Sequence, residues 1–154
     1  MTTFNKLPQD NNIQELIKST FDTDLSLAGN WGYIQEDATI IEALPKGMSL
    51  KQLEHMITSI RAHIEMNLTQ NNENRYAGIN VNEKNREIIQ TEKGTFDKVS
   101  YQITAMKETI YTTFIQEYKK GYGKEDFDLN LHFKKREKAT LVREIIHYFE
   151  ISQL

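Results

Sequence analysis

An amphipathic segment in the first half of the chain constrains the fold most. It begins at Ser49 and runs to Asn67, SLKQLEHMITSIRAHIEMN. Ser49 is a natural N-cap, and Gln52 stands three residues later, which is the spacing of a capping box. At 100° per residue, the following apolar side chains lie within about 60° of Leu53: Leu50, Met56, Ile57, Ile60, Ile64 and Leu68. The pattern therefore predicts a helix from Leu50 to about Asn67 with one buried face.

The residues before this helix predict a shorter helix and a β-hairpin. Residues 1–8 are expected to form a flexible or extended arm, and a helix capped by Asp10 or Asn12 is expected to follow and to end near Phe21. Ile13, Leu16 and Ile17 form its apolar stripe. Residues 31–42, WGYIQEDATIIE, predict a hairpin whose strands WGYI and ATIIE turn through Gln35, Glu36 and Asp37.

A second hairpin is predicted over residues 76–91, where YAGINV and REIIQT are joined through residues 82–85. From Phe96 onward the apolar residues fit two different spacings. Alternation favours a strand over residues 96–106, whereas steps of three or four favour a helix that persists to Gly121. The longer pattern predicts a helix for the later part, and the earlier part stays open between strand and helix.

The C-terminal part also allows two interpretations. Residues 126–133, DFDLNLHF, alternate like a strand that precedes a helix at about 135–150. In that helix the inner face would consist of Val142, Ile145, Ile146 and Phe149. The alternative is one longer helix capped at Asp126 or Asp128.

Composition fits one soluble domain spanning residues 1–154. The chain has a mass of 18.0 kDa, with 38% hydrophobic and 27% charged residues, and no internal repeat or linker. We therefore expect a single, helix-rich α+β domain, in which about four helices pack on a small antiparallel sheet built from two hairpins. The chain contains no cysteine, so disulfides, thiolate metal sites and thiol nucleophiles are excluded.

Location and charge limit the partners. The N-terminal residues lack the apolar run of a signal peptide, and no segment approaches the roughly eighteen apolar residues of a membrane span. A cytoplasmic protein that makes no contact with membranes is expected. The net charge of −3 and the pI near 5.8 argue against a surface that coats nucleic acid, although a local basic patch is compatible with them.

Charged residues on the central helix form the first candidate site. Glu54, Arg61 and Glu65 lie on one flank beside the apolar stripe. The favoured interpretation is a flank of paired charges, and the alternative is a polar ligand or enzyme site that also uses His63. His55 and His63 are about 12 Å apart along the axis, which is too far for one metal ion.

Glu144 and His147 have the spacing of a helical metal motif, but on the predicted helix both point away from the inner face. No phosphate-binding loop, nucleophile motif or second metal motif accompanies them. No metal, cofactor or catalytic residue is therefore expected.

Two patches could bind a partner. Lys134, Lys135 and Arg136 lie in a basic stretch interleaved with aromatic residues, which is typical of nucleic-acid grooves, although nearby acidic residues offset much of its charge. A solvated charged face is the favoured interpretation there. Trp31 and Tyr33 lie beside glycines at the first hairpin, where they either form a binding hot spot or anchor the hairpin to the core.

The leading hypothesis is a non-enzymatic protein-binding module, such as an adaptor, inhibitor, immunity-type protein or assembly factor, with Trp31 and Tyr33 at its binding site. The first alternative is nucleic-acid binding through the basic C-terminal third. The second is a small-molecule or metal-assisted enzyme that uses the flank around Arg61. A homodimer formed through a helix face or a strand edge is compatible with all three hypotheses.

Overall fold

A computed structural model describes residues 4–9, 12–70, 74–125 and 127–154. It contains four helices and a five-stranded mixed sheet, with 39% of the residues helical and 32% in strands. The helices are α1 (Ile13–Phe21), α2 (Leu50–His63), α3 (Glu108–Gly121) and α4 (Leu129–Ala139). The strands are β1 (Leu27–Gly29), β2 (Thr39–Ile41), β3 (Tyr76–Thr91), β4 (Gly94–Lys107) and β5 (Leu141–Glu150). A 3₁₀ turn, η1 (Gln35–Asp37), precedes β2, and a π-helical turn, η2 (Ile64–Leu68), extends α2.

The sheet has the order β1-β2-β5-β4-β3, in which β2 and β5 are parallel and all other neighbours are antiparallel. The expected single α+β domain is confirmed, but a small sheet made of two hairpins and a helix-rich composition are wrong. The sheet is larger because residues 96–106, left open between strand and helix, and residues 141–150, predicted as a helix, both belong to strands within it.

The last strand, β5, replaces the helix expected at about 135–150. The inward side chains of β5 alternate along the strand: Leu141, Arg143, Ile145, His147 and Phe149. Val142 and Ile146, which the helical interpretation placed inside, are 55% and 39% exposed. These residues form a strand because β5 pairs with β4 on one side and with β2 on the other. Both partners are distant in the sequence, so the local spacing of apolar residues does not reveal them.

Strand β3 is continuous where a second hairpin was expected. The turn lies at residues 92–93, and β4 follows from Gly94. The alternating period of residues 96–106 was therefore the correct one, and the helix α3 begins only at Glu108. Register shifts between residues 77 and 80 and between 83 and 85 let the strand bend without ending, which is the usual role of bulges.

The first hairpin lies partly outside its predicted position. Its strands pair Leu27 with Ile41 and Gly29 with Thr39, so the strand WGYI is wrong, whereas residues 35–37 do form the turn. The strand predicted over residues 126–133 is also wrong. Asp128 caps α4 by accepting a hydrogen bond from the Leu131 backbone N–H at 3.0 Å, which matches one of the two alternative caps. Asp126 and Asp10 lie outside the described residues.

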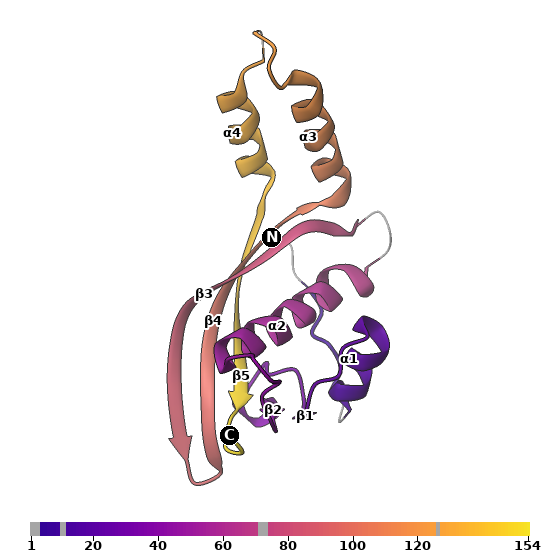
Figure 1. Cartoon of the computed structure of the whole chain (residues 1–154). Helices are drawn as coiled ribbons and strands as arrows, with labels where there is room; N and C mark the ends of the chain where they lie inside the picture. Colours follow the sequence, from indigo (N-terminus) through magenta and orange to yellow (C-terminus); the bar gives the residue numbers. More distant parts are fainter. Residues whose placement is uncertain (1–3, 10–11, 71–73, 126) are drawn as a thin grey trace.

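Helices α1 and α2 confirm the local predictions. Asn12 accepts a hydrogen bond from the backbone N–H of Glu15 at 3.4 Å, and the capping box of Ser49 and Gln52 is complete. Both helices lie near the sheet and contribute to one core with Trp31 and Phe149 (Figure 1). None of the helices within the described part of the chain is long and apolar enough to cross a membrane.

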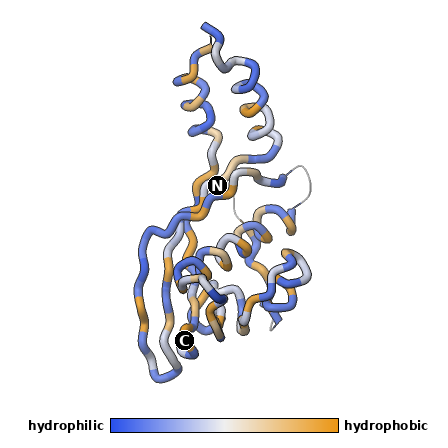
Figure 2. Tube along the Cα trace, viewed as in Figure 1, coloured by the Kyte–Doolittle hydropathy of each residue, from blue (hydrophilic) through white to orange (hydrophobic). Residues whose placement is uncertain are grey.

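Helices α3 and α4 form a hairpin that projects away from the rest of the molecule (Figure 1). We call residues 108–139 the α3–α4 hairpin. Hydrophobic residues recur on both of its helices as they do in the body of the protein (Figure 2). Within α3 and α4, only Gly121 and His132 are fully buried.

Candidate functional site

Glu65 holds three separated parts of the chain together. Its Oε1 accepts a hydrogen bond from Arg143 of β5 at 3.0 Å, and its Oε2 accepts one from the Tyr33 hydroxyl and lies 3.5 Å from Arg61 Nε. The Glu65 side chain is only 1% exposed. Burial and the hydrogen bond to Glu65 raise the pKa of Tyr33, so its hydroxyl remains a proton donor.

Arg61 satisfies backbone groups of two other segments of the chain. Its Nη1 donates to the carbonyl oxygens of Trp31 at 3.1 Å and Ile146 at 3.2 Å, and its guanidinium lies 4.1 Å from the centre of the Tyr33 ring. Trp31 is itself 1% exposed, within the core. Arg61, Glu65, Trp31 and Tyr33 thus belong to one internal network, whose polar groups are directed at one another.

Glu54 belongs to a second network, centred on Arg86 of β3. Arg86 bonds Glu54 at 2.7 Å, Asp97 at 3.0 Å and Glu83 at 2.6 Å. Burial, and then the hydrogen bond shared with Asp97, raise the pKa of Glu54 to about 8. One guanidinium cannot balance three carboxylates, so Glu54 retains a proton near neutral pH.

His147 forms a third polar centre, and it is fully buried. Its Nε2 lies 2.9 Å from the Thr39 hydroxyl, its Nδ1 lies 3.0 Å from the Thr58 hydroxyl, and its ring stacks on Phe149 with centroids 4.0 Å apart. Burial, and the nearby charge of Arg61, lower the pKa of His147 well below its usual value. The helical interpretation directed His147 outward, whereas strand alternation turns it into the core.

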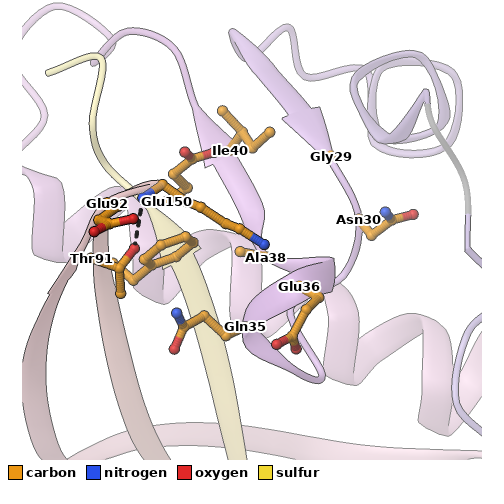
Figure 3. A pocket seen from close by; sticks show the side chains of 11 residues that line it. Gly29, Asn30, Gln35, Glu36, Ala38, Ile40, Thr91, Glu92 and Glu150 are labelled. Carbon is orange, nitrogen blue, oxygen red and sulfur yellow. Dashed lines mark hydrogen bonds between the residues drawn. The ribbon is translucent and has the colours of Figure 1, made fainter.

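Hollows also lie elsewhere on the surface of the described residues, and two of them contain apolar side chains. The first, of about 690 Å³, has Gln35 and Glu36 of η1 on one side and Thr91 and Glu92 on another (Figure 3), with Phe96 among its apolar lining residues. The second, of about 780 Å³, follows the outer side of α2, where its lining includes Met48, Met56, Lys46, Lys51 and His55. Neither hollow is lined by Arg61, Glu65 or His147.

The α3–α4 hairpin has two unlike faces. On α3, taking Phe114 as pointing to α4, Tyr118 and Ile115 lie about 40° and 100° to one side. On α4, taking His132 as inward, Leu129 and Phe133 lie about 60° and 100° to its corresponding side. The rings of Tyr118 and Phe133 are 6.4 Å apart between centroids, so these sides coincide.

We call this surface the apolar face of the hairpin. It consists of Tyr111, Ile115, Tyr118, Tyr122, Leu129 and Phe133. Leu129, Phe133 and Tyr122 are 41%, 47% and 69% exposed, and Tyr122 joins the face because its ring lies 5.4 Å from that of Tyr118. The opposite face, by the same helical geometry, carries Leu131 and Lys138.

The hairpin is held internally by aromatic contacts around His132. This side chain is 1% exposed and packs against Phe114, Tyr118 and Phe127, with ring centroids 5.6–5.7 Å apart. Its Nδ1 lies 3.4 Å from Glu117 Oε1 on α3. The contact fixes the two helices against each other and leaves the apolar face uncovered.

The basic residues predicted as a site lie on α4. Lys134 and Lys135 are exposed, and the Arg136 guanidinium lies 5.8 Å from the centre of the Phe133 ring, at the border of the apolar face. His63 is exposed beside Phe21, with ring centroids 6.0 Å apart, and takes no part in the network of Arg61.

Sequence reasoning missed Arg86, Asp97 and Arg143 as partners of the predicted glutamates. A signal for Arg143 was present, because it alternates with Ile145, His147 and Phe149 in the two-residue period of a strand. No local signal joins Glu54 to Arg86, since they meet only when β3 lies beside α2.

Most of the chain matches a known family. Residues 9–149 match the family described as "Domain of unknown function (DUF3598), N-terminal". No curated protein and no solved structure matches the chain. Since the family match spans nearly all the elements described above, from α1 into β5, the chain belongs to the DUF3598 N-terminal domain family.

Proposed function

We propose that the protein is a non-enzymatic protein-binding module that docks through the apolar face of the α3–α4 hairpin. The observation that carries the proposal is the exposure of Leu129, Phe133 and Tyr122, at 41%, 47% and 69%, on an element that projects from the body. Exposed apolar patches of this kind on soluble proteins commonly mark interaction sites.

The packing of the hairpin supports the same function. Helices α3 and α4 bury only Gly121 and His132, and Leu129, Phe133 and Tyr122 remain exposed on one face. Helices in stable domains normally bury such a face against another layer. No described element of the body covers Phe133 or Leu129, so a partner would supply that layer.

The composition of the face is also typical of interface hot spots. Tyrosine and arginine are enriched among interface hot spots, and phenylalanine is enriched at interfaces in general. Tyr118, Tyr122, Phe133 and Arg136 gather here. This proposal moves the binding site away from Trp31, which is buried in the core. Glu54, Arg61 and Glu65 then serve stability, because each is buried and ion-paired.

The test is native mass spectrometry of the protein recovered from its host at low salt. We expect a heteromeric complex for the wild type and for Leu131→Ser, which removes a 49% exposed leucine from the opposite face of α4. The Leu129→Ser and Phe133→Ser variants should lose the bound subunit while keeping the wild-type circular dichroism spectrum.

Two results would contradict the proposal. One is a complex that survives both apolar-face substitutions in folded protein. The other is retention of nucleic acid, in place of a protein, with an affinity that falls steeply as salt increases.

A further inference from the structure

We infer that Glu54 and Asp97 share one proton as a buried acid pair, which acts as a pH-sensitive latch between α2 and residues 82–97 of the sheet. We call Glu54 of α2 and Asp97 of β4 the acid pair. Arg86 Nη1 donates to both of them, to Glu54 Oε1 at 2.7 Å and to Asp97 Oδ2 at 3.0 Å. Because one nitrogen bonds both carboxyl groups, they lie side by side, and their side chains are 0% and 2% exposed.

The acid pair receives too little positive charge for two carboxylates. Arg86 is shared with a third acid, Glu83, which its Nη2 bonds at 2.6 Å. The hydrogen bond to Arg86 lowers the pKa of Glu83, whose side chain also reaches water. Two ionised carboxylates that are both buried repel each other strongly, and one shared proton removes that repulsion.

A buried oxygen of Glu54 is independent evidence for the proton. Glu54 Oε2 accepts no hydrogen bond from any residue that the structure describes. Ionised Glu54 would leave this oxygen without a donor, at a high cost in desolvation. Protonated Glu54 is neutral and can donate to Asp97, and burial together with this hydrogen bond raises the pKa of Glu54 to about 8.

The other titratable groups that the structure places around the acid pair give it no second positive charge. Tyr101 of β4 lies near Glu54, and burial raises the pKa of its hydroxyl, which therefore stays neutral. Lys51 and His55 of α2 are exposed, and they act on Glu83 at the outer border of the network. The acid pair is thus left with one guanidinium.

The acid pair joins two parts of the fold. Glu54 belongs to α2, whereas Asp97 and Arg86 belong to β4 and β3, and β3 is the outer strand of the sheet (Figure 1). When the proton leaves, Arg86 can keep its bonds to Asp97 and Glu83 within the strands, and Asp97 repels the ionised Glu54. The contact of α2 with residues 82–97 should therefore loosen as the pH rises.

The first experiment follows the proton. NMR of the side-chain carboxyl carbons measures the titration of Glu54 and Asp97 in the full chain. We expect a midpoint of about 8 for Glu54, and Asp97→Asn should lower it by about one pH unit or more, because the neighbouring charge is gone. The control Glu87→Gln removes an exposed charge from the other face of β3, and it should move the midpoint by less than about 0.3.

Hydrogen exchange then tests the latch. The closed form holds the proton more tightly than the open form, so opening becomes easier as the pH rises. The protection of amides in residues 82–97 should fall by up to about tenfold per pH unit between about pH 6 and 8, after correction for the intrinsic rate. Glu54→Gln keeps a hydrogen-bond donor at every pH, so its protection should stay level. Opening is local, so these amides should exchange about tenfold or more faster than those of β5.

Titration and exchange can each contradict the inference. A midpoint of Glu54 near its ordinary value of 4.5 would overturn the acid pair. A midpoint that Asp97→Asn leaves unchanged would show that burial alone holds the proton on Glu54, which overturns the sharing. Exchange of residues 82–97 at the same rate as β5, or a pH dependence that persists in Glu54→Gln, would overturn the latch.

Discussion

His147 shows how a buried polar residue is fixed in a single proton arrangement. The Thr39 hydroxyl donates its only proton to the Asn30 carbonyl oxygen at 2.7 Å, so it can only accept from His147. The proton of the neutral ring is therefore on Nε2, and Nδ1 accepts from the Thr58 hydroxyl at 3.0 Å. Strands β2 and β5 are tied to α2 through this one ring.

Gly32 is expected to be essential to that arrangement. Its φ of +76° disfavours other residues, and an added Cβ would lie 2.2 Å from His147 Cδ2 and 2.6 Å from the Tyr148 carbonyl oxygen. Gly32→Ala should lower the free energy of unfolding by about 2–4 kcal/mol, from overpacking together with the left-handed backbone. Urea denaturation measures this loss.

Gly47→Ala provides the control. Gly47 has a φ of +80°, but no atom lies within 4 Å of an added Cβ. Only the backbone cost of about 1 kcal/mol should appear. Equal losses for the two variants would contradict the packing role of Gly32.

Local reasoning at the residue scale succeeded where the partners were close in sequence. The caps at Asn12 and Ser49 and the Arg61–Glu65 pair each depend on residues three or four positions apart. The prediction of paired charges on a flank beside the apolar stripe did not include the burial of the Arg61–Glu65 pair, whose side chains are 3% and 1% exposed. Arg143 and Tyr33 reach Glu65 from distant parts of the chain and complete the network.

At the scale of elements, the α3–α4 hairpin interrupts a pair of antiparallel strands. Ala105 of β4 lies opposite Leu141 of β5, so the strands meet directly beneath the hairpin. Few residues of the hairpin approach the body. One place of approach is Gly78 of β3, where a Cβ added to the glycine would lie 3.6 Å from the ring of Tyr111 on α3. The hairpin is therefore an insertion on a sheet that closes without it.

Replacing residues 108–138 with Asn-Gly should leave a folded body. This dipeptide forms the tight turn that antiparallel strands prefer, and it would join Lys107 to Ala139. We expect cooperative urea unfolding, within about 2 kcal/mol of the wild type, because the hairpin buries little against the body. Intrinsic Trp31 fluorescence reports the transition.

A broad, non-cooperative transition in that variant would show that the hairpin is part of the core. The Asn-Gly variant should also lose the partner that the full chain binds. These two measurements distinguish a docking element from a structural one.

At the scale of the whole molecule, two buried groups give stability an optimum in pH. The pKa of Glu54 is raised to about 8, so its contribution is present at low pH and is lost as the pH rises toward and through 8. The pKa of His147 is lowered, so its contribution is lost as the pH falls through about 6.5, the usual histidine value. Between about pH 4.5 and 6.5 the two effects oppose each other, so stability should be nearly level there and should decline above about pH 6.5 and below about pH 4.5.

Glu54→Gln should flatten the alkaline side of this profile. One titrating group changes the free energy of unfolding by at most about 1.4 kcal/mol per pH unit, and the variant removes that slope between pH 6.5 and 8. Urea denaturation across this range measures it, with the exposed Glu42→Gln as the control. If the free energy of unfolding of Glu54→Gln still falls with pH as in the wild type, a group other than Glu54 loses the proton in this range.

The sequence by itself determined the features that depend on near neighbours. The amphipathic stripe of α2, its capping box and the cap of α1 each depend on residues three or four positions apart. Such residues are neighbours within a single helix, so the sequence shows them directly. The α+β class followed from the same local patterns.

Only the tertiary structure decided where the ambiguous segments belong. Residues 141–150 satisfy both a helical and an alternating period, and pairing with β4 and β2 selects the strand. That choice turns His147 and Arg143 inward, brings Arg143 to Glu65, and leaves the α3–α4 hairpin projecting. A strand's hydrogen bonds come from distant residues, so local spacing could not reveal which period these residues would adopt.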